Sequence, residues 1–264
     1  MSVKIGRVTA IYRFPVKSMA GELLRVANLR WQGIDGDRQY GFYRAANTSR
    51  FPWLTGREVA ELITCSACYL APDDPRHSRL IVTIRGDQFD INDPRLHDYL
   101  SRAAGEEVRL IQVGRGLFDA MPVSILTPPT IAQIAARCGR SIDVRRFRAN
   151  IIIEPSDEST REIDWIGKTL IFGDRSDAAK LCANVAIDRC AMITIDPDTA
   201  ERDPTILRRV VEDFNNEIGV RCATGAPGTI ASGDVVRIGD RALVPFASLQ
   251  HPCAPPGACP PNPR

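Results

Sequence analysis

One stretch of the chain combines a predicted core strand with a chemically reactive side chain: Ala186-Ile187-Asp188-Arg189-Cys190-Ala191-Met192-Ile193-Thr194-Ile195-Asp196-Pro197-Asp198-Thr199. Residues 191–195 are mostly apolar and β-prone, which predicts a buried strand that the turn signal at 196–199 ends. Cys190 directly follows Arg189, and a neighbouring guanidinium stabilises a thiolate. A thiolate attacks electrophiles and binds soft metals, whereas a buried structural cysteine is the alternative interpretation.

The composition is that of a globular protein. The chain has 264 residues, of which 25% are charged and 44% hydrophobic, and this length fits one large domain or two small ones. A formal net charge of +2 gives no global attraction to nucleic acid or to a membrane surface. No apolar run approaches the ~18 residues of a membrane span, and we expect no signal peptide before the first strand. Eight cysteines without a signal peptide favour reduced thiols in the cytoplasm.

Short strand signals recur along the whole chain, with few helical ones between them. Strands are predicted at about residues 3–12, 22–29, 39–43, 80–84, 108–113, 122–126, 151–153, 170–173, 181–185 and 227–238. Helices are predicted at 95–104, 128–137 and 204–218, the last with Leu207, Val210, Val211, Phe214 and Ile218 on one apolar face. This spacing favours an α+β, β-rich fold with closed or strongly bent sheets rather than regular βαβ alternation.

Cations gather at strand boundaries near glycines. Lys17-Ser18 follows the first predicted strand, and Arg38 ends the turn that begins at Gly33. A cation, a hydroxyl and free backbone N–H groups together suit a phosphate, and solvated charges beside turns are the alternative. Arg145, Arg146 and Arg148 precede the strand at 151–153 and fit either a polyanion site or a solvated face. Cys65 and Cys68 resemble half of a metal motif, but on a strand their thiols would face opposite sides.

The order of these motifs resembles MOSC-domain proteins, named after the C-terminal domain of molybdenum cofactor sulfurase. The resemblance covers about residues 3–240 and is carried by Pro15-Val16-Lys17-Ser18, Gly33-Ile34-Asp35-Gly36-Asp37-Arg38, Arg146-Phe147-Arg148-Ala149-Asn150-Ile151, Arg189-Cys190 and Pro227-Gly228-Thr229-Ile230. The most similar type has an N-terminal MOSC β-barrel domain, as in the mitochondrial amidoxime-reducing component and its bacterial relatives. The resemblance implies a MOSC β-barrel core, a barrel-like N-terminal subdomain, a few peripheral helices and a site for the molybdenum cofactor.

The resemblance also implies roles for individual residues. Cys190 matches the cysteine that ligates molybdenum in the reductases and carries sulfur in the sulfurases, and Asp119 matches an acid near the metal. Lys17, Ser18 and Arg38 match positions that hold the phosphate of the cofactor. Arg148 and Asn150 match a pair lining the pterin pocket, and Arg189 accompanies them as a cofactor-binding residue. We therefore predict that Lys17 and Arg38 converge on one phosphate site.

The predicted activity is that of a molybdenum-dependent oxidoreductase, which reduces N-hydroxylated or related N-oxygenated small molecules. No ferredoxin-like domain follows, because Cys253 and Cys259 alone cannot hold an iron–sulfur cluster, so a separate electron-donor protein is expected. A sulfur carrier or sulfurtransferase using Cys190, or a carrier of the cofactor, is the alternative. Pyridoxal phosphate is disfavoured, because Lys17 and Lys168 lack the helical context of such a site. A Ser-His-Asp hydrolase is also disfavoured by the surroundings of His77, His97 and His251.

Three segments are expected. Residues 1–115 form the N-terminal barrel domain, 116–244 the MOSC domain, and 245–264 a disordered, proline-rich and dispensable tail. One departure from the family pattern stands at Glu58-Val59-Ala60-Glu61, where relatives carry a Glu-Pro-Arg-like motif.

Overall fold

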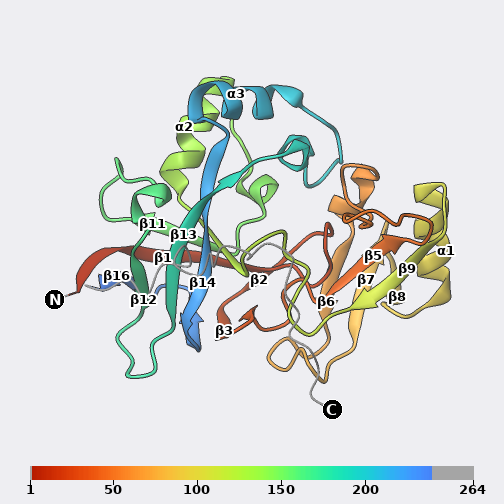
Figure 1. Ribbon diagram of the computed structural model, residues 1–264, viewed down its shortest axis with the longest axis horizontal. Helices are drawn as coiled ribbons and strands as arrows, with labels where there is room; N and C mark the ends of the chain where they lie inside the picture. Colours follow the sequence, from red (N-terminus) through yellow and green to blue (C-terminus); the bar gives the residue numbers. More distant parts are fainter. Residues whose placement is uncertain (1, 240–264) are drawn as a thin grey trace, which may run out of the picture.

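The computed structural model describes residues 2–239, and a closed barrel of seven strands dominates it (Figure 1). Its strands are β1 (Val3–Arg13), β10 (Val123–Leu126), β11 (Ile151–Pro155), β12 (Thr169–Phe172), β13 (Lys180–Asp188), β14 (Glu217–Ala226) and β16 (Val235–Gly239). Around the barrel they run β1-β11-β10-β14-β13-β12-β16 and return to β1, with β2 (Glu22–Leu24) added outside on β1. All neighbours are antiparallel except the parallel pair β10–β11.

Strand β1 closes the barrel because it pairs along one part with β16 and along another with β11. Register shifts between Lys4 and Gly6 and between Val8 and Ala10 bend the strand from one partner toward the other. At Gly6 a side chain would collide with the backbone oxygen of Glu154, so the approach of β11 requires glycine there.

The interior of the barrel is filled by inward-facing apolar side chains from all seven strands, including Val8, Ile125, Ile151, Phe172 and Val236. Each of these side chains is at most 1% exposed. Burial on this scale contributes roughly 1.5–3 kcal/mol for each large apolar side chain.

Helices α2 (Pro128–Cys138) and α3 (Pro204–Phe214) pack together outside the barrel. A proline opens both, and the Asp203 side chain caps α3 by accepting a hydrogen bond from the backbone of Thr205 at 2.9 Å. Ile206, Val210 and Phe214 lie on the face of α3 that packs into a shared core with α2 and the short 3-10 helix η4 (Ala191–Thr194).

The N-terminal half adds a second lobe with its own core, at the right of Figure 1. It contains β5 (Tyr40–Arg44) paired with β9 (Val108–Gln112), the sheet β6 (Ser66–Tyr69), β7 (Leu80–Ile84) and β8 (Asp87–Asp90), helix α1 (Pro94–Ala104) and the 3-10 helix η1 (Ala60–Thr64). A three-stranded sheet of β3 (Val26–Arg30), β4 (Gly33–Ile34) and β15 (Gly228–Ala231) joins residues from both halves. The remaining 3-10 helices are η2 (Val144–Phe147) and η3 (Glu162–Trp165).

The β-rich α+β prediction with a barrel core is confirmed, and two local predictions are wrong. Residues 191–195 do not form a strand, because 191–194 form η4, and the strand β13 precedes Cys190 instead. The third helix ends at Phe214 rather than at residue 218, because Asn215 adopts a left-handed backbone with φ 53°. Val211, which was expected on the apolar face, is 52% exposed.

The predicted domain boundary between residues 115 and 116 stays a prediction. The structure adds that β1, from the first half of the chain, is a strand of the barrel whose other strands come from the second half. The tail predicted from Pro245 lies outside the described residues, as do Cys253 and Cys259. Within residues 2–239, no helix has both the length and the apolar character needed to cross a membrane.

Candidate functional site

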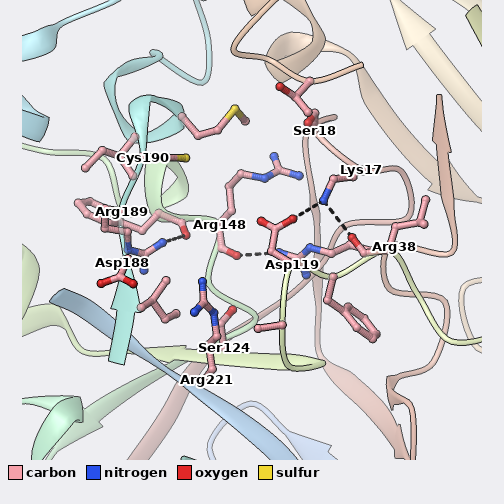
Figure 2. A pocket seen from close by; sticks show the side chains of 18 of the residues that line it. Lys17, Ser18, Arg38, Asp119, Ser124, Arg148, Asp188, Arg189, Cys190 and Arg221 are labelled. Carbon is pink, nitrogen blue, oxygen red and sulfur yellow. Dashed lines mark hydrogen bonds and ion pairs between the residues drawn. The ribbon is translucent and has the colours of Figure 1, made fainter. Parts of the chain in front are cut away.

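A pocket of about 320 Å³ lies between the barrel and the N-terminal lobe, and all eight predicted site residues line it. Figure 2 shows Cys190 and Arg189 on one side, Lys17, Arg38 and Asp119 on the other, and Arg148 reaching between them. Each residue lies within five positions of the end of a barrel strand or of β5. Those residues are Lys17, Ser18, Arg38, Asp119, Arg148, Asn150, Arg189 and Cys190.

Lys17 follows β1 and forms an ion pair across the pocket. Its Nζ donates to Asp119 Oδ1 at 2.8 Å and to the backbone oxygen of Leu117 at 3.1 Å. Burial lowers the pKa of Lys17, Asp119 opposes this shift, and the positive charges of Arg38 and Arg148 add to it. Burial raises the pKa of Asp119, but Lys17, Arg38 and Arg221 outweigh burial and leave it below its usual range. Asp119 is therefore ionised at neutral pH.

Arg38 joins the turn before β5 to the segment before β11. Its Nη1 donates to Asp37 Oδ2 at 2.5 Å and to Asn150 Oδ1 at 3.3 Å, while its Nη2 donates to the backbone oxygen of Arg148 at 3.0 Å. The Asn150 amide also donates to the backbone oxygen of Tyr12 at 3.2 Å. Asn150 thus links the ends of three strands. Arg38 forms these three hydrogen bonds within the protein, so they are not available to a ligand.

Arg148 has a guanidinium nitrogen without a hydrogen-bond partner within residues 2–239, as has Arg189. Its backbone is left-handed with φ 52°, and its guanidinium lies 4.4 Å from the centre of the Phe14 ring. The Nη2 atom is buried and has no hydrogen-bond partner within residues 2–239. Burial, and after it the charge of Arg38, lowers the pKa of Arg148 to about 9. A buried, unpaired guanidinium of this kind suits an anionic ligand.

Arg189 and Cys190 follow β13 and face different surroundings. Arg189 donates to the backbone oxygens of Ile218 at 2.7 Å and Phe147 at 2.9 Å, so its main contacts are structural. Burial lowers the pKa of Arg189 to about 10. Cys190 is exposed in the pocket, and no side chain of the described residues forms a hydrogen bond with it. That Arg189 stabilises a thiolate at Cys190 and takes part in cofactor binding stays a prediction.

The donor set limits how the pocket could hold a metal. No group of three or more His, Cys, Asp or Glu side chains suitable for a metal ion occurs in the described part of the chain. A single thiolate does not complete the coordination of a soft metal, so further ligands would have to come from a cofactor. These side chains fit a cofactor that carries both a metal and an anionic tail. Cys190 would bind the metal, and the tail would be held by Lys17, Ser18, Arg38 and Arg148.

Further lining residues escaped sequence reasoning. Ser124 and Arg221 lie on β10 and β14, Asp188 ends β13, and Phe51 and Arg57 come from the N-terminal lobe. Ser124 accepts a hydrogen bond from the backbone of Asn150 at 3.2 Å, a contact that only the parallel pairing of β10 and β11 creates. No local motif marks these residues. Cys65 and Cys68 diverge as expected, since one is buried and the other exposed.

The fold is thus a closed β-barrel beside a pocket that is lined by cations and contains an exposed thiol. Residues 113–237, just under half of the chain, match the family model of the MOSC domain. MOSC domains are associated with binding of the molybdenum cofactor.

Solved structures of similar fold include the YuaD protein from Bacillus subtilis, with 14% sequence identity and a TM-score of 0.48 over 90% of this chain and 98% of that one. YiiM from Geobacillus stearothermophilus has 12% identity and a TM-score of 0.35 over 51% of this chain and 69% of its own. No curated protein matches the chain significantly.

Proposed function

We propose that this protein binds the molybdenum cofactor in the pocket and reduces N-hydroxylated small molecules with electrons from a separate donor. One observation carries the proposal: Lys17, Arg38 and Arg148 enter the same pocket as the exposed thiol of Cys190, and Arg148 keeps a buried Nη2 without a partner in residues 2–239. Such an atom costs free energy unless a ligand accepts its hydrogen bond. A phosphate supplies the acceptors and the negative charge.

The chemistry of each side chain indicates which part of the cofactor it would hold. Lys17, Ser18, Arg38 and Arg148 would hold the phosphate, and Asn150 would fix the segment beside the pterin. Cys190 would give one thiolate to molybdenum, because a soft sulfur ligand suits that metal. When bound, the cofactor supplies a metal centre that exchanges two electrons.

The proposed reaction balances with simple reactants. An amidoxime takes up two electrons and two protons, its N–O bond breaks, and an amidine and water leave. The electrons come from a donor protein, or from a chemical reductant in the test tube. Asp119 is an ionised partner of Lys17 at neutral pH, because its pKa lies below its usual range, so we do not assign it as the proton donor.

A sulfur-transfer function is the second candidate, and the exposure of Cys190 favours it. A thiol that lines the pocket and has no hydrogen-bond partner among the described residues can attack the outer sulfur of a donor persulfide, so that Cys190 becomes the persulfide and the donor leaves as a thiol. Intact mass spectrometry of the freshly purified protein would show an added sulfur atom that is removed by reductant. That atom should be absent from Cys190→Ser.

The reductase proposal is tested by replacing Cys190 in protein made by a host that synthesises the cofactor. Cys190→Ser keeps the side-chain shape but replaces a soft ligand with a hard one, so amidoxime reduction should fall to background. Pterin content should fall less, because the phosphate contacts remain. Metal analysis, pterin content and turnover with a chemical donor are measured together.

Two other cysteines serve as controls. Cys182 on β13 and Cys222 on β14 lie outside the pocket lining, so Cys182→Ser and Cys222→Ser should keep both cofactor content and turnover. Cys222 is fully buried, so its variant also reports how much activity is lost through damage to the barrel. Full activity in Cys190→Ser would overturn the proposal, and an equal loss in all three variants would mean that the cysteine changes act through folding.

A further inference from the structure

The mouth of the pocket carries an aromatic ring and a cation that the proposed chemistry does not use. Phe51 is 37% exposed and Arg57 is also exposed, and both line the pocket from the connection between β5 and η1. We call Phe51 and Arg57 the rim pair. They come from the N-terminal lobe, whereas Cys190 follows a barrel strand.

The Phe51 ring lies between two cations. The guanidinium carbon of Arg57 is 4.8 Å from the ring centre, and Lys17 Nζ is 5.7 Å from it. Lys17 belongs to the inner, largely buried part of the pocket, while Arg57 is open to solvent. The ring therefore contacts both an inner cation, already paired with Asp119, and an outer one.

Arg57 has no acidic partner within residues 2–239. Its Nε donates to Thr55 Oγ1 at 3.4 Å, and the neighbouring Glu58 carboxylate instead accepts hydrogen bonds from the backbone and the hydroxyl of Thr55. The guanidinium thus keeps most of its donors for a ligand.

The backbone beneath Arg57 is held in place by the other half of the chain. Arg202 Nη2 donates to the backbone oxygens of Gly56 and Arg57, each at 2.9 Å. The Met192 side chain lies so close that a Cβ at Gly56 would be 3.2 Å from its sulfur. Since η4, which carries Met192, follows Cys190 directly, the position of Arg57 is tied to the segment that carries the thiol.

We infer that the rim pair selects substrates that carry a carboxylate on a planar or aromatic frame. The ring of the substrate packs against the edge of the Phe51 ring, and its carboxylate accepts two hydrogen bonds from the planar guanidinium of Arg57. The N-oxygenated group then points inward, toward Cys190. The inference rests on the proposed function for the reaction, but the binding preference for a carboxylate is measurable without turnover.

Matched compounds test the preference. Benzamidoxime and 4-carboxybenzamidoxime differ only in the carboxylate, and both are titrated calorimetrically into the cofactor-loaded protein and assayed for reduction with a chemical donor. We expect tighter binding and a lower KM for the carboxylate. In Arg57→Gln that advantage should shrink by about five- to tenfold, with a much smaller change for benzamidoxime. Arg57→Lys should restore part of it.

Two further variants test separately how the charge and the aromatic ring contribute to substrate binding. Arg50→Gln removes one exposed charge from the same connection but outside the pocket lining, so it should keep the wild-type preference. Phe51→Leu should weaken binding of both aromatic compounds and leave the carboxylate still preferred.

The outcomes distinguish this inference from the reductase assignment. If the carboxylate binds through Arg57 while neither compound is reduced, the rim site stands and the reductase assignment fails. If both are reduced with equal KM, or if Arg57→Gln affects both equally, the inference is overturned. A loss of pterin from Arg57→Gln would also overturn it, because Arg57 would then hold the cofactor.

Discussion

At the scale of a single residue, the charge of Arg148 is incompletely compensated within residues 2–239. Its guanidinium lies against Phe14, close to a second cation, Arg38, whose own guanidinium is 4.7 Å from the same ring. Like charges around one ring repel, and the buried Nη2 has no acceptor in the described part of the chain. An anion bound between these two cations, as we propose for the phosphate, would stabilise the arrangement.

The first prediction at this scale is that Arg148→Met stabilises the ligand-free protein. Replacing an incompletely paired buried charge with an apolar side chain of similar length often stabilises by about 1–2 kcal/mol, which corresponds to a Tm increase of roughly 2–6 °C in a chain of this size. Phosphate and pterin binding should fall in the same variant. Differential scanning calorimetry and pterin content measure the two effects, and a lower Tm would show that Arg148 supports the fold instead.

The stabilisation should depend on pH. Because burial lowers the pKa of Arg148 to about 9 in the folded chain, the full penalty applies below pH 9, where the guanidinium is charged in both the folded and the unfolded chain. Above pH 9 the folded chain releases the proton and the unfolded chain keeps it, so the penalty declines. The Tm difference between Arg148→Met and wild type should therefore shrink as the pH rises through 9.

Sequence reasoning found the residues whose neighbours have a recognisable pattern. Lys17, Arg38, Arg148 and Cys190 stand next to strand ends in motifs whose order resembles one family, and the fold brings all four to one pocket. It did not find Arg57, because its role depends on Phe51 and on the hydrogen bonds from Arg202, and Arg202 is 145 positions away.

At the scale of elements, runs of apolar residues predicted which side chains are buried, but not whether the backbone forms a strand or a helix. Ile193 and Ile195 are both buried, yet residues 191–194 form a 3-10 helix, because a run of five apolar residues fits a strand or a short helix equally well. The third helix was predicted too long for a related reason. Ile218 shares the core of α3 but reaches it from β14, after the left-handed Asn215 and Asn216 reverse the chain.

The connection between β5 and η1 depends on Arg202, which leads to the second prediction. Arg202→Ala removes both hydrogen bonds to the backbone of Gly56 and Arg57, at a cost of about 1 kcal/mol. Hydrogen–deuterium exchange of residues 45–59 should become faster and the KM for a carboxylated substrate should rise. Arg209→Ala, which breaks only a surface pair with Glu212 on α3, is the control. Equal exchange in the two variants would show that Arg202 does not fix the rim.

At the scale of the molecule, the barrel ties the first residues of the chain to the last described ones. β1 forms hydrogen-bonded ladders with both β11 and β16, and β15 pairs with β3, so each half supplies strands to sheets of the other. The spacing of strand signals predicted a closed sheet but not this exchange, because pairing between strands about 150–230 positions apart leaves no local pattern.

The last prediction follows from this closure. A fragment of residues 116–264 contains the matched MOSC segment almost entirely but lacks β1, so β11 and β16 would present open edges in place of a closed barrel. The edges would expose Leu170, Ile153 and Val236, which β1 helps to cover within one core. We expect the fragment to aggregate or to unfold without a cooperative transition, as followed by circular dichroism and calorimetry beside the full chain. Supplying residues 1–30 on a second chain should restore part of the cooperativity, because β1, β2 and β3 then complete their sheets. A fragment that unfolds cooperatively on its own at the Tm of the full chain would show that the MOSC segment folds without β1 and that the boundary at residues 115 and 116 separates two independent domains.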